Sequence, residues 1–434
     1  MNRLKLRIEC NLKEIREKGM PCIFVKAGRL LLRLTALILA IPVVFFIVVL
    51  KPFMRVRFLK LRSDRLGHYG YEPERYLCQR DAGLHGPPNF DIFYNEGNVC
   101  NKQLKKMWES KLLVLRIPHI ALLMTQVRLL LRKLPGCGEH VFEIQGIGDF
   151  HPSWSLCRTQ PHLQFTPQEE EAGQEALRKM GIPSGAQYVC IYGRDSAYLN
   201  QAFSSRDWTY HDYRDDDIQT YLMAAEMLTT RGHYVIRMGH HVKEALKTTN
   251  PMIIDYAAKG YRTDFLDIYL PATCRFFLGN PSGLVAIPAI FRRPIAYVNF
   301  SQPPGFYNWD LNGIFIYKRV WKQEEKRFFS YQEMLELNLP IHCCRKDLPE
   351  IARLGEIDIV DNTPQEIQTL AMEMDDRING RYPRMTGEDR SLLKRFKALY
   401  PHIHDDVKFS TIGAEFLREN ADLLEKSSPS RIRV

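Results

Sequence analysis

The segment that decides the fold is Arg275–Asn299, which reads RFFLGNPSGLVAIPAIFRRPIAYVN. Its runs Arg275–Leu278 and Ile295–Asn299 are typical of buried strands, and Ser282–Phe291 between them has the length and composition of a helix. Strands that are separated by helix-length segments indicate a parallel sheet. This segment therefore predicts an α/β domain.

The same rhythm extends on both sides of this segment. Tyr188–Tyr192 and Tyr234–Met238 are predicted strands, and the amphipathic stretch Asp216–Thr230 between them is a predicted helix. Further helices are expected at Phe265–Leu270 and at Asn362–Arg377, the latter with Pro at its first position. These elements together describe one parallel-sheet lobe.

The preceding part of the chain shows a second, less regular α/β pattern. Strands are predicted at Met54–Leu61, Asp91–Tyr94 and Val141–Ile144, and helices at Lys102–Ser110 and Ala121–Leu134. A chain of 434 residues is too long for one ordinary core and suits two such lobes. We expect a basic membrane-associated segment at 1–52, a first Rossmann-like lobe at 53–160, a second Rossmann-like lobe at 161–385, and C-terminal helices with a tail at 386–434.

An apolar segment precedes the first lobe. Leu34–Leu50 is uncharged, and basic residues flank it at both ends. Its length approaches the roughly 20 apolar residues that span a bilayer. Pro42 lies in its middle and removes a helix hydrogen bond, so either a full span or a kinked, re-entrant or interfacial helix is possible. If the lobes use nucleotide-sugars, they have to face the cytosol, which would favour the second topology.

Charge and cysteine content restrict the partners. The formal net charge is +10, which suits anionic partners such as nucleic acid, anionic lipid or phosphorylated substrates. Much of the excess flanks the apolar segment, which favours a membrane over nucleic acid. The ten cysteines show no CxxC spacing, so we expect neither a zinc site nor a disulfide framework. A cytosolic location of the lobes is the simpler interpretation.

Polar residues follow four consecutive predicted strands of the second lobe. Ligands of parallel sheets bind outside the carboxyl ends of the strands, so these residues are predicted to share one rim. They are Gly193, Arg194, Asp195, Ser196, Arg237, Gly239, Gly279, Asn280, Ser282, Gly283 and Asn299.

This rim has the residue types that a nucleotide diphosphate needs. Ser282 and Gly283 are expected to open a helix whose amides point at a phosphate, and Arg194 and Arg237 would supply positive charge. The alternative is that the glycines only form turns and Arg237 only forms a salt bridge. The aspartates at 215–217 precede a predicted helix, where capping explains them better than a metal does.

A general base is expected in the first lobe. His68 follows a predicted strand in Ser63–His68, and an imidazole titrates near working pH. Glu96, Asp149 and His151 also lie near predicted strand ends and are alternative bases.

Several blocks resemble a family of bacterial glycosyltransferases associated with surface-polysaccharide gene clusters. They cover roughly residues 55 to 420 in the same order, and their combination is specific. The blocks are SDRLGHYGYEPERYL (Ser63–Leu77), GRDSAYL (Gly193–Leu199), YHDYRDDDIQTY (Tyr210–Tyr221), YVIRMG (Tyr234–Gly239), the segment Asp267–Asn299 and NTPQEI (Asn362–Ile367).

The resemblance implies a GT-B-like architecture of two Rossmann-like lobes and transfer of a sugar. It implies these site residues: Arg194, Asp195, Tyr213, Arg214, Arg237, Ser282, Gly283 and His68. We therefore expect a metal-independent glycosyltransferase that needs no cofactor besides its nucleotide-diphosphate-sugar donor. Its acceptor would be a membrane-proximal or lipid-linked glycan. The catalytic residues would be His68 and Asp195.

Two other functions stay open from the sequence. A sugar-nucleotide epimerase shares this architecture and would form its product without an acceptor. A non-catalytic membrane-associated scaffold for polysaccharide assembly would bind no nucleotide tightly. A nucleic-acid binder fits least well, because its basic residues should line one face of the lobes.

Overall fold

The computed structural model describes residues 19–86, 89–117, 120–144, 159–195, 213–240, 242–301, 313–336, 356–399 and 410–425. Internal contacts divide the chain into two compact units. The first unit takes its residues from Met1–Asp64, Gly83–Val99 and Glu109–Ile144, and the second from Arg65–Ala82, Cys100–Trp108 and Gln145–Val434. Each unit is described by itself.

The first unit contains a small parallel sheet with two long helices. Strands β1 and β2 pair in parallel over seven residues, and β3 pairs with the end of β2. Its elements are α2 (Met20–Leu50), β1 (Arg55–Leu61), β2 (Asn89–Asn95), β3 (Val114–Leu115), α5 (Ile120–Lys133) and η1 (Gly138–His140). Val141–Ile144, predicted as a strand, has no regular secondary structure: its neighbour His140 bonds back to the carbonyl of Val56, and the segment pairs with no described strand.

Helix α2 runs through Pro42 without a break. It is the one described helix that is long and apolar enough to cross a membrane by length and composition, a test that core helices and signal sequences also pass. Only Cys22, Ala36, Ala40, Val44 and Ile47 are buried. Helix α2 is therefore continuous from Met20 to Leu50, and a kink at Pro42 stays a prediction.

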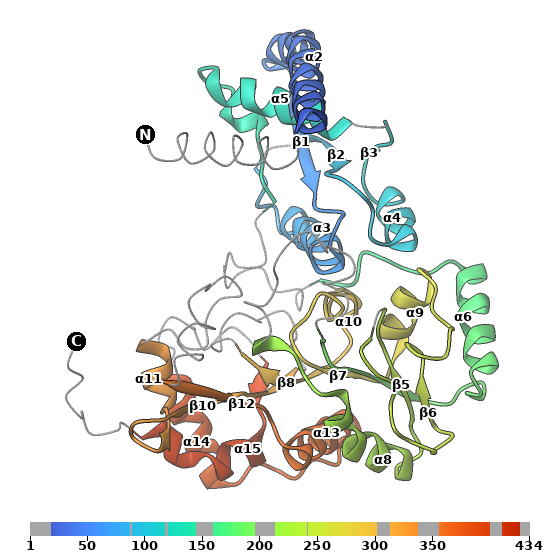
Figure 1. The fold of residues 1–434 in the computed structure, drawn as a ribbon, viewed down its shortest axis with the longest axis vertical. Helices are drawn as coiled ribbons and strands as arrows, with labels where there is room; N and C mark the ends of the chain where they lie inside the picture. Colours follow the sequence, from blue (N-terminus) through green and yellow to red (C-terminus); the bar gives the residue numbers. More distant parts are fainter. Residues whose placement is uncertain are drawn as a thin grey trace. The chain divides into compact units, whose positions relative to one another are not determined.

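The second unit is built around a seven-stranded sheet in the order β13-β9-β8-β7-β4-β5-β6, in which all neighbours pair in parallel. Figure 1 shows α9 and α10 on one side of the sheet and α8 and α13 on the other. The strands are β4 (Tyr188–Tyr192), β5 (Tyr234–Arg237), β6 (Ile253–Asp255), β7 (Phe277–Gly279), β8 (Ile295–Phe300), β9 (Ile314–Tyr317) and β13 (Thr411–Ile412). The parallel sheet and the mixed α/β class are as predicted.

A smaller antiparallel sheet in the order β11-β10-β12 accompanies it: β10 (Arg319–Lys322), β11 (Arg327–Phe328) and β12 (Ile357–Val360). The helices of the unit are α3 (Leu66–Asp81), α4 (Lys102–Glu109), α6 (Pro167–Lys179), η5 (Ile218–Tyr221), α8 (Leu222–Thr230), α9 (Leu266–Thr273), α10 (Ala286–Ile290), α11 (Tyr331–Glu336), α13 (Pro364–Ile378), α14 (Gly387–Ala398), α15 (Ala414–Glu419) and η6 (Ala421–Leu424).

Two of these helices differ from their predicted bounds. Helix α10 begins at Ala286 and not at Ser282, because the residues from Ser282 to Val285 form a turn that contacts α3. The predicted helix Asp216–Thr230 is split into η5 and α8. Internal contacts also place α3 and most of α4 in the second unit, although in the sequence they lie between segments of the first unit.

Candidate functional site at the carboxyl ends of the strands

The ends of β4 and β7 are joined by one buried amide side chain. Asn280 follows β7 and is 1% exposed. Its Oδ1 accepts from the backbone amide of Arg194 at 3.2 Å, and its Nδ2 donates to the carbonyl of Arg214 at 2.8 Å. Because the side chain of Asn280 bonds in both directions, it fixes the backbone after β4 and the segment before η5 against the end of β7. Arg194 and Asn280, predicted to share one rim, do lie together, and Arg214, which only the family resemblance implied, lies beside them.

Arg214 reaches from this segment to the turn after β7. Its Nη2 donates to the carbonyl of Pro281 at 2.9 Å, beside Ser282 and Gly283. Among the described residues Arg214 has no carboxylate partner. The Ser282 hydroxyl is shielded from solvent and has no hydrogen-bond partner in the described part of the chain. A guanidinium and an unsatisfied hydroxyl therefore flank one short turn.

The N-terminal end of α3 packs against the same turn. A Cβ built on Gly67 would lie 2.9 Å from the Cα of Gly283, so only glycine permits this approach of the two backbones. A Cβ built on Gly70, one turn further, would lie 3.4 Å from side-chain atoms of Ala286 and Ile287 of α10. The Gly67–His68 pair and the Ser282–Gly283 pair, which are more than two hundred residues apart, are neighbours in the second unit.

His68 is oriented by a buried carboxylate. Its Nδ1 lies 2.7 Å from Oε1 of Glu72, one helical turn away, and the side chain of Glu72 is 2% exposed. The His68 side chain is 22% exposed. If Nδ1–H donates to the carboxylate, Nε2 keeps its lone pair as a proton acceptor. Sequence reasoning did not consider Glu72, although the i,i+4 spacing on a predicted helix was the available signal.

The three aspartates at 215–217 have three different roles. Asp215 pairs with Arg194. Asp217 caps η5, since its side chain accepts from the amide of Gln219 at 2.9 Å, as capping predicts. Asp216 is buried and accepts from the hydroxyl of Tyr221 at 2.7 Å. Only one aspartate of the three is therefore a cap.

Lys318, which sequence reasoning did not consider, lies at the end of β9 and is 1% exposed. Its Nζ lies 2.7 Å from Asp361 and 3.6 Å from Asp216, and it donates to the carbonyl of Tyr213 at 2.9 Å. Burial raises the pKa of Asp216 to about 7, and the Lys318 charge opposes that shift. This buried group holds the segment before η5, to which Tyr213 and Arg214 belong.

Arg237 lies in a buried ion pair. It is 1% exposed, and its Nη1 lies 3.1 Å from Oδ1 of Asp255, its cross-strand partner on β6. Asp255 also accepts from the amides of Leu246 and Ala258. These contacts give Arg237 a structural role, and its phosphate role stays a prediction.

The remaining predicted residues are distributed as follows. Asp195 follows β4 and accepts from the amide of Lys243 at 3.1 Å. Gly239 lies in the loop after β5. Glu96 pairs with Lys60 in the first unit. Ser196, Asp149 and His151 lie outside the described residues.

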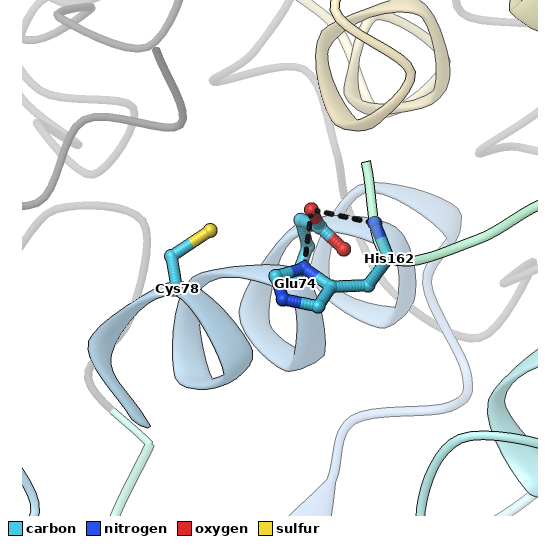
Figure 2. A group of neighbouring side chains, drawn as sticks. All are labelled: Glu74, Cys78 and His162. Atoms are coloured by element: carbon cyan, nitrogen blue, oxygen red, sulfur yellow. Dashed lines mark hydrogen bonds and ion pairs between the residues drawn. The ribbon is translucent and has the colours of Figure 1, made fainter. Parts of the chain in front are cut away.

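One described group has the residue types of a metal site. Glu74 and Cys78 of α3 and His162 offer ligand atoms that all lie within 4.8 Å of one another (Figure 2). Both Glu74 and Cys78 are buried. Nδ1 of His162 lies 2.9 Å from Oε1 of Glu74, and its Nε2 lies 2.8 Å from Asp81.

An arginine already neutralises this group. Nη2 of Arg292, just after α10, lies 2.6 Å from Oε1 of Glu74 and 3.7 Å from Sγ of Cys78. Burial by itself lowers the pKa of His162, but hydrogen bonds with Cys78, Glu74 and Asp81 together raise it to about 10. A metal would have to displace this proton and compete with Arg292 for Glu74. We therefore interpret the group as an ion network that ties α3 to the end of α10.

Comparison with known proteins completes the description. No protein-family model matches the chain, and no curated protein matches its sequence. Among solved structures, E. coli ADP-heptose LPS heptosyltransferase II is 13% identical with a TM-score of 0.37, covering 61% of this chain and 90% of its own.

Two further structures are similar at the same level. A family 9 glycosyl transferase from Veillonella parvula is 12% identical with a TM-score of 0.41, covering 74% of this chain and 98% of its own. The iron-containing dodecameric glycosyltransferase TibC of enterotoxigenic E. coli is 11% identical with a TM-score of 0.36, covering 75% and 77%. Because the identities and TM-scores are low, we base the function proposed next on residues of this chain.

Proposed function

We propose that the chain is a GT-B-like glycosyltransferase that binds a nucleotide-diphosphate-sugar at the carboxyl ends of β4 and β7. The observation that carries the proposal is the contact of Arg214 with the Pro281 carbonyl, beside Ser282 and Gly283. A guanidinium, a hydroxyl and backbone amides at one turn are the donors that a diphosphate needs. The family resemblance of the surrounding blocks supports transfer of a sugar.

Arg214 would neutralise the diphosphate as it leaves the sugar. The N-terminal end of α3 meets the same turn, and a helix of 16 residues adds its positive dipole end there. In many transferases a divalent cation offsets this charge, whereas here a fixed side chain and a helix end would do so. We therefore propose that transfer needs no metal.

His68 is the proposed general base. Glu72 would hold Nδ1–H, so that Nε2 takes the proton of the acceptor hydroxyl as the new glycosidic bond forms. The acceptor is proposed to be a glycan near or in the membrane, because α2 offers a long apolar surface. Nucleotide-sugars are cytosolic, so the two units would face the cytosol.

Nucleotide binding tests the proposal. The detergent-solubilised chain would be heated with UDP, GDP, CDP or dTDP, with and without EDTA. A ligand at a hundred times its Kd stabilises by about 2.7 kcal/mol, so one nucleotide should raise the Tm visibly, and EDTA should not reverse the shift.

Two variants locate the binding site. Arg214→Gln should weaken nucleotide binding roughly tenfold to hundredfold, since a charge-assisted hydrogen bond contributes about 1.5–3 kcal/mol. Arg178→Gln, an exposed arginine on α6, is the matched control and should bind normally. No shift with any nucleotide, or equal shifts for both variants, would contradict the proposal.

A further inference from the structure

Helix α2 has one buried stripe, which is continuous along its C-terminal half and to which Cys22 near its beginning also belongs. Ala36, Ala40, Val44 and Ile47 are 6%, 0%, 6% and 2% exposed and recur every three or four residues. The last three of these join a core with β1 and α5, which includes Val56, Phe58, Tyr94, Met124 and Leu131. Protein of the first unit therefore lies alongside the middle and the end of the apolar segment.

This packing argues against an upright span. Ala40 lies near the centre of Leu34–Leu50, the stretch that would cross the hydrocarbon core, yet it is covered by soluble-type elements of its own unit. One of them is α5, which packs along α2 and whose Arg128 pairs with Glu143 at 2.9 Å. An upright α2 would carry these charged groups to bilayer depth, where charge is expensive.

The N-terminal half continues the same stripe with cations. At 3.6 residues per turn, Lys26, Arg29 and Arg33 lie on the line that Ala36 and Ala40 extend. The rest of the surface is apolar and exposed along the whole helix. Its exposed large side chains are Ile23, Phe24, Val25, Leu30, Leu31, Leu32, Leu34, Ile38, Leu39, Ile41, Phe45, Phe46, Val48 and Val49. A wide apolar face beside a narrow basic stripe is typical of a helix that lies in a membrane interface.

The described cations that flank the apolar segment differ in their partners. Beyond its end, Lys51 bonds to the carbonyl of Gly136, Arg55 pairs with Glu139 at 2.7 Å, and Arg57 is buried. Arg29 and Arg33 are exposed and have no carboxylate partner among the described residues. The basic residues that flank both ends in the sequence are thus not equivalent.

We propose that α2 lies in the plane of one leaflet of an anionic bilayer, with its apolar face in the acyl region and Arg29 and Arg33 at lipid phosphates. Helix α2 does not cross the membrane, and the first unit stays on the side from which the helix inserts. The helix is about 46 Å long, half as long again as the roughly 30 Å hydrocarbon core. This inference does not depend on sugar transfer.

Depth measurements test the orientation. Phe24 and Phe45 are 70% and 69% exposed and about 31 Å apart along the helix. Each would be replaced by tryptophan in the full chain, reconstituted in vesicles of phosphatidylcholine and phosphatidylglycerol. Quenching by shallow and deep brominated lipids would be measured as the difference from the parent chain, which corrects for its five native tryptophans. Equal depth for both positions is expected. Different depths, or tags at the two chain ends protected from protease on opposite sides, would overturn the proposal.

A competition between vesicles tests the basic stripe. The chain should prefer vesicles with phosphatidylglycerol over pure phosphatidylcholine. Gln at both Arg29 and Arg33 should lower that preference roughly thirtyfold. Each cation near an anionic surface contributes roughly fivefold, and the two factors multiply. Gln at Arg178 and Lys179, exposed on α6, is the matched control and should change nothing. An unchanged preference in the α2 variant would exclude the role of the stripe.

Discussion

Arg237 has the residue type and the strand-end position of a phosphate ligand. Its charge, however, is already paired with a carboxylate. The guanidinium is buried against Asp255, and Asp255 also accepts from the backbone amides of Leu246, before β6, and Ala258, after β6. Removing one partner of a buried ion pair leaves the other charge buried and unpaired. The free-energy cost of that unpaired charge is much larger than the net stabilisation by the intact pair. The contacts of this residue therefore predict a stability effect first.

Arg237→Met should lower the free energy of unfolding by about 3–5 kcal/mol. Asp255→Ala should cost at least as much, because the amides of Leu246 and Ala258 lose their acceptor as well. Urea unfolding followed by circular dichroism measures both. A stable Arg237→Met chain that binds nucleotide poorly would instead restore Arg237 to the phosphate site.

At the same scale, Glu72 tests the proposed base. Glu72→Gln keeps the shape but removes the charge that orients the His68 imidazole, so transfer should fall roughly tenfold to hundredfold. An unchanged kcat with normal folding would remove His68 from the mechanism.

At the scale of elements, the contact between α3 and the turn before α10 is a backbone contact between glycines. The Cβ that Gly67 lacks would lie 2.9 Å from Cα of Gly283, and backbone cannot move aside as a flexible side chain can. This joint sets where His68 lies relative to Ser282. Its geometry follows from two glycines that are far apart in the sequence.

Gly67→Ala should cost about 1–3 kcal/mol and impair nucleotide binding, because α3 has to shift away from the turn. Gly97→Ala is the matched control, since nothing lies within 4 Å of its added Cβ. Its effect should stay within about 0.5 kcal/mol. Thermal unfolding of both variants measures these costs. Equally small costs for both would show that the contact between α3 and the turn is an ordinary loop contact.

At the scale of the whole molecule, the ion network of Glu74, Asp81, His162 and Arg292 joins segments that are up to 218 residues apart. His162 has a folded pKa of about 10 against 6.5 for the free side chain. A raised pKa means that the folded chain binds the proton more tightly. Its contribution is fully present below about pH 6.5 and is lost as the pH rises towards 10.

Unfolding free energy should therefore decrease between about pH 7 and 10, by on the order of a few kcal/mol from this group. His162→Gln should flatten this part of the pH profile, and the difference between the two profiles separates His162 from other groups that titrate above pH 8. Parallel profiles would show that His162 is not protonated in the folded chain.

The sequence alone predicted the parallel sheet of the second unit, because buried parallel strands are continuous apolar runs with helix-length connections. β4 was predicted residue for residue, and β5 and β8 to within one residue. The rule for the carboxyl ends of strands brought Arg194 and Asn280 together correctly, whereas Arg214 was implied only by the family resemblance. These patterns are local in the sequence, so a single sequence is enough to recognise them.

Only the tertiary structure decided which charges are compensated. Arg237, Arg57 and Arg292 meet their carboxylates across strands or between distant segments, and no spacing in the sequence encodes those meetings. The same is true of the cations that flank the apolar segment of α2. They look equivalent in the sequence, but folding pairs or buries those that follow the segment. Composition determines where a helix is apolar, whereas packing determines which face and which charge remain for a partner.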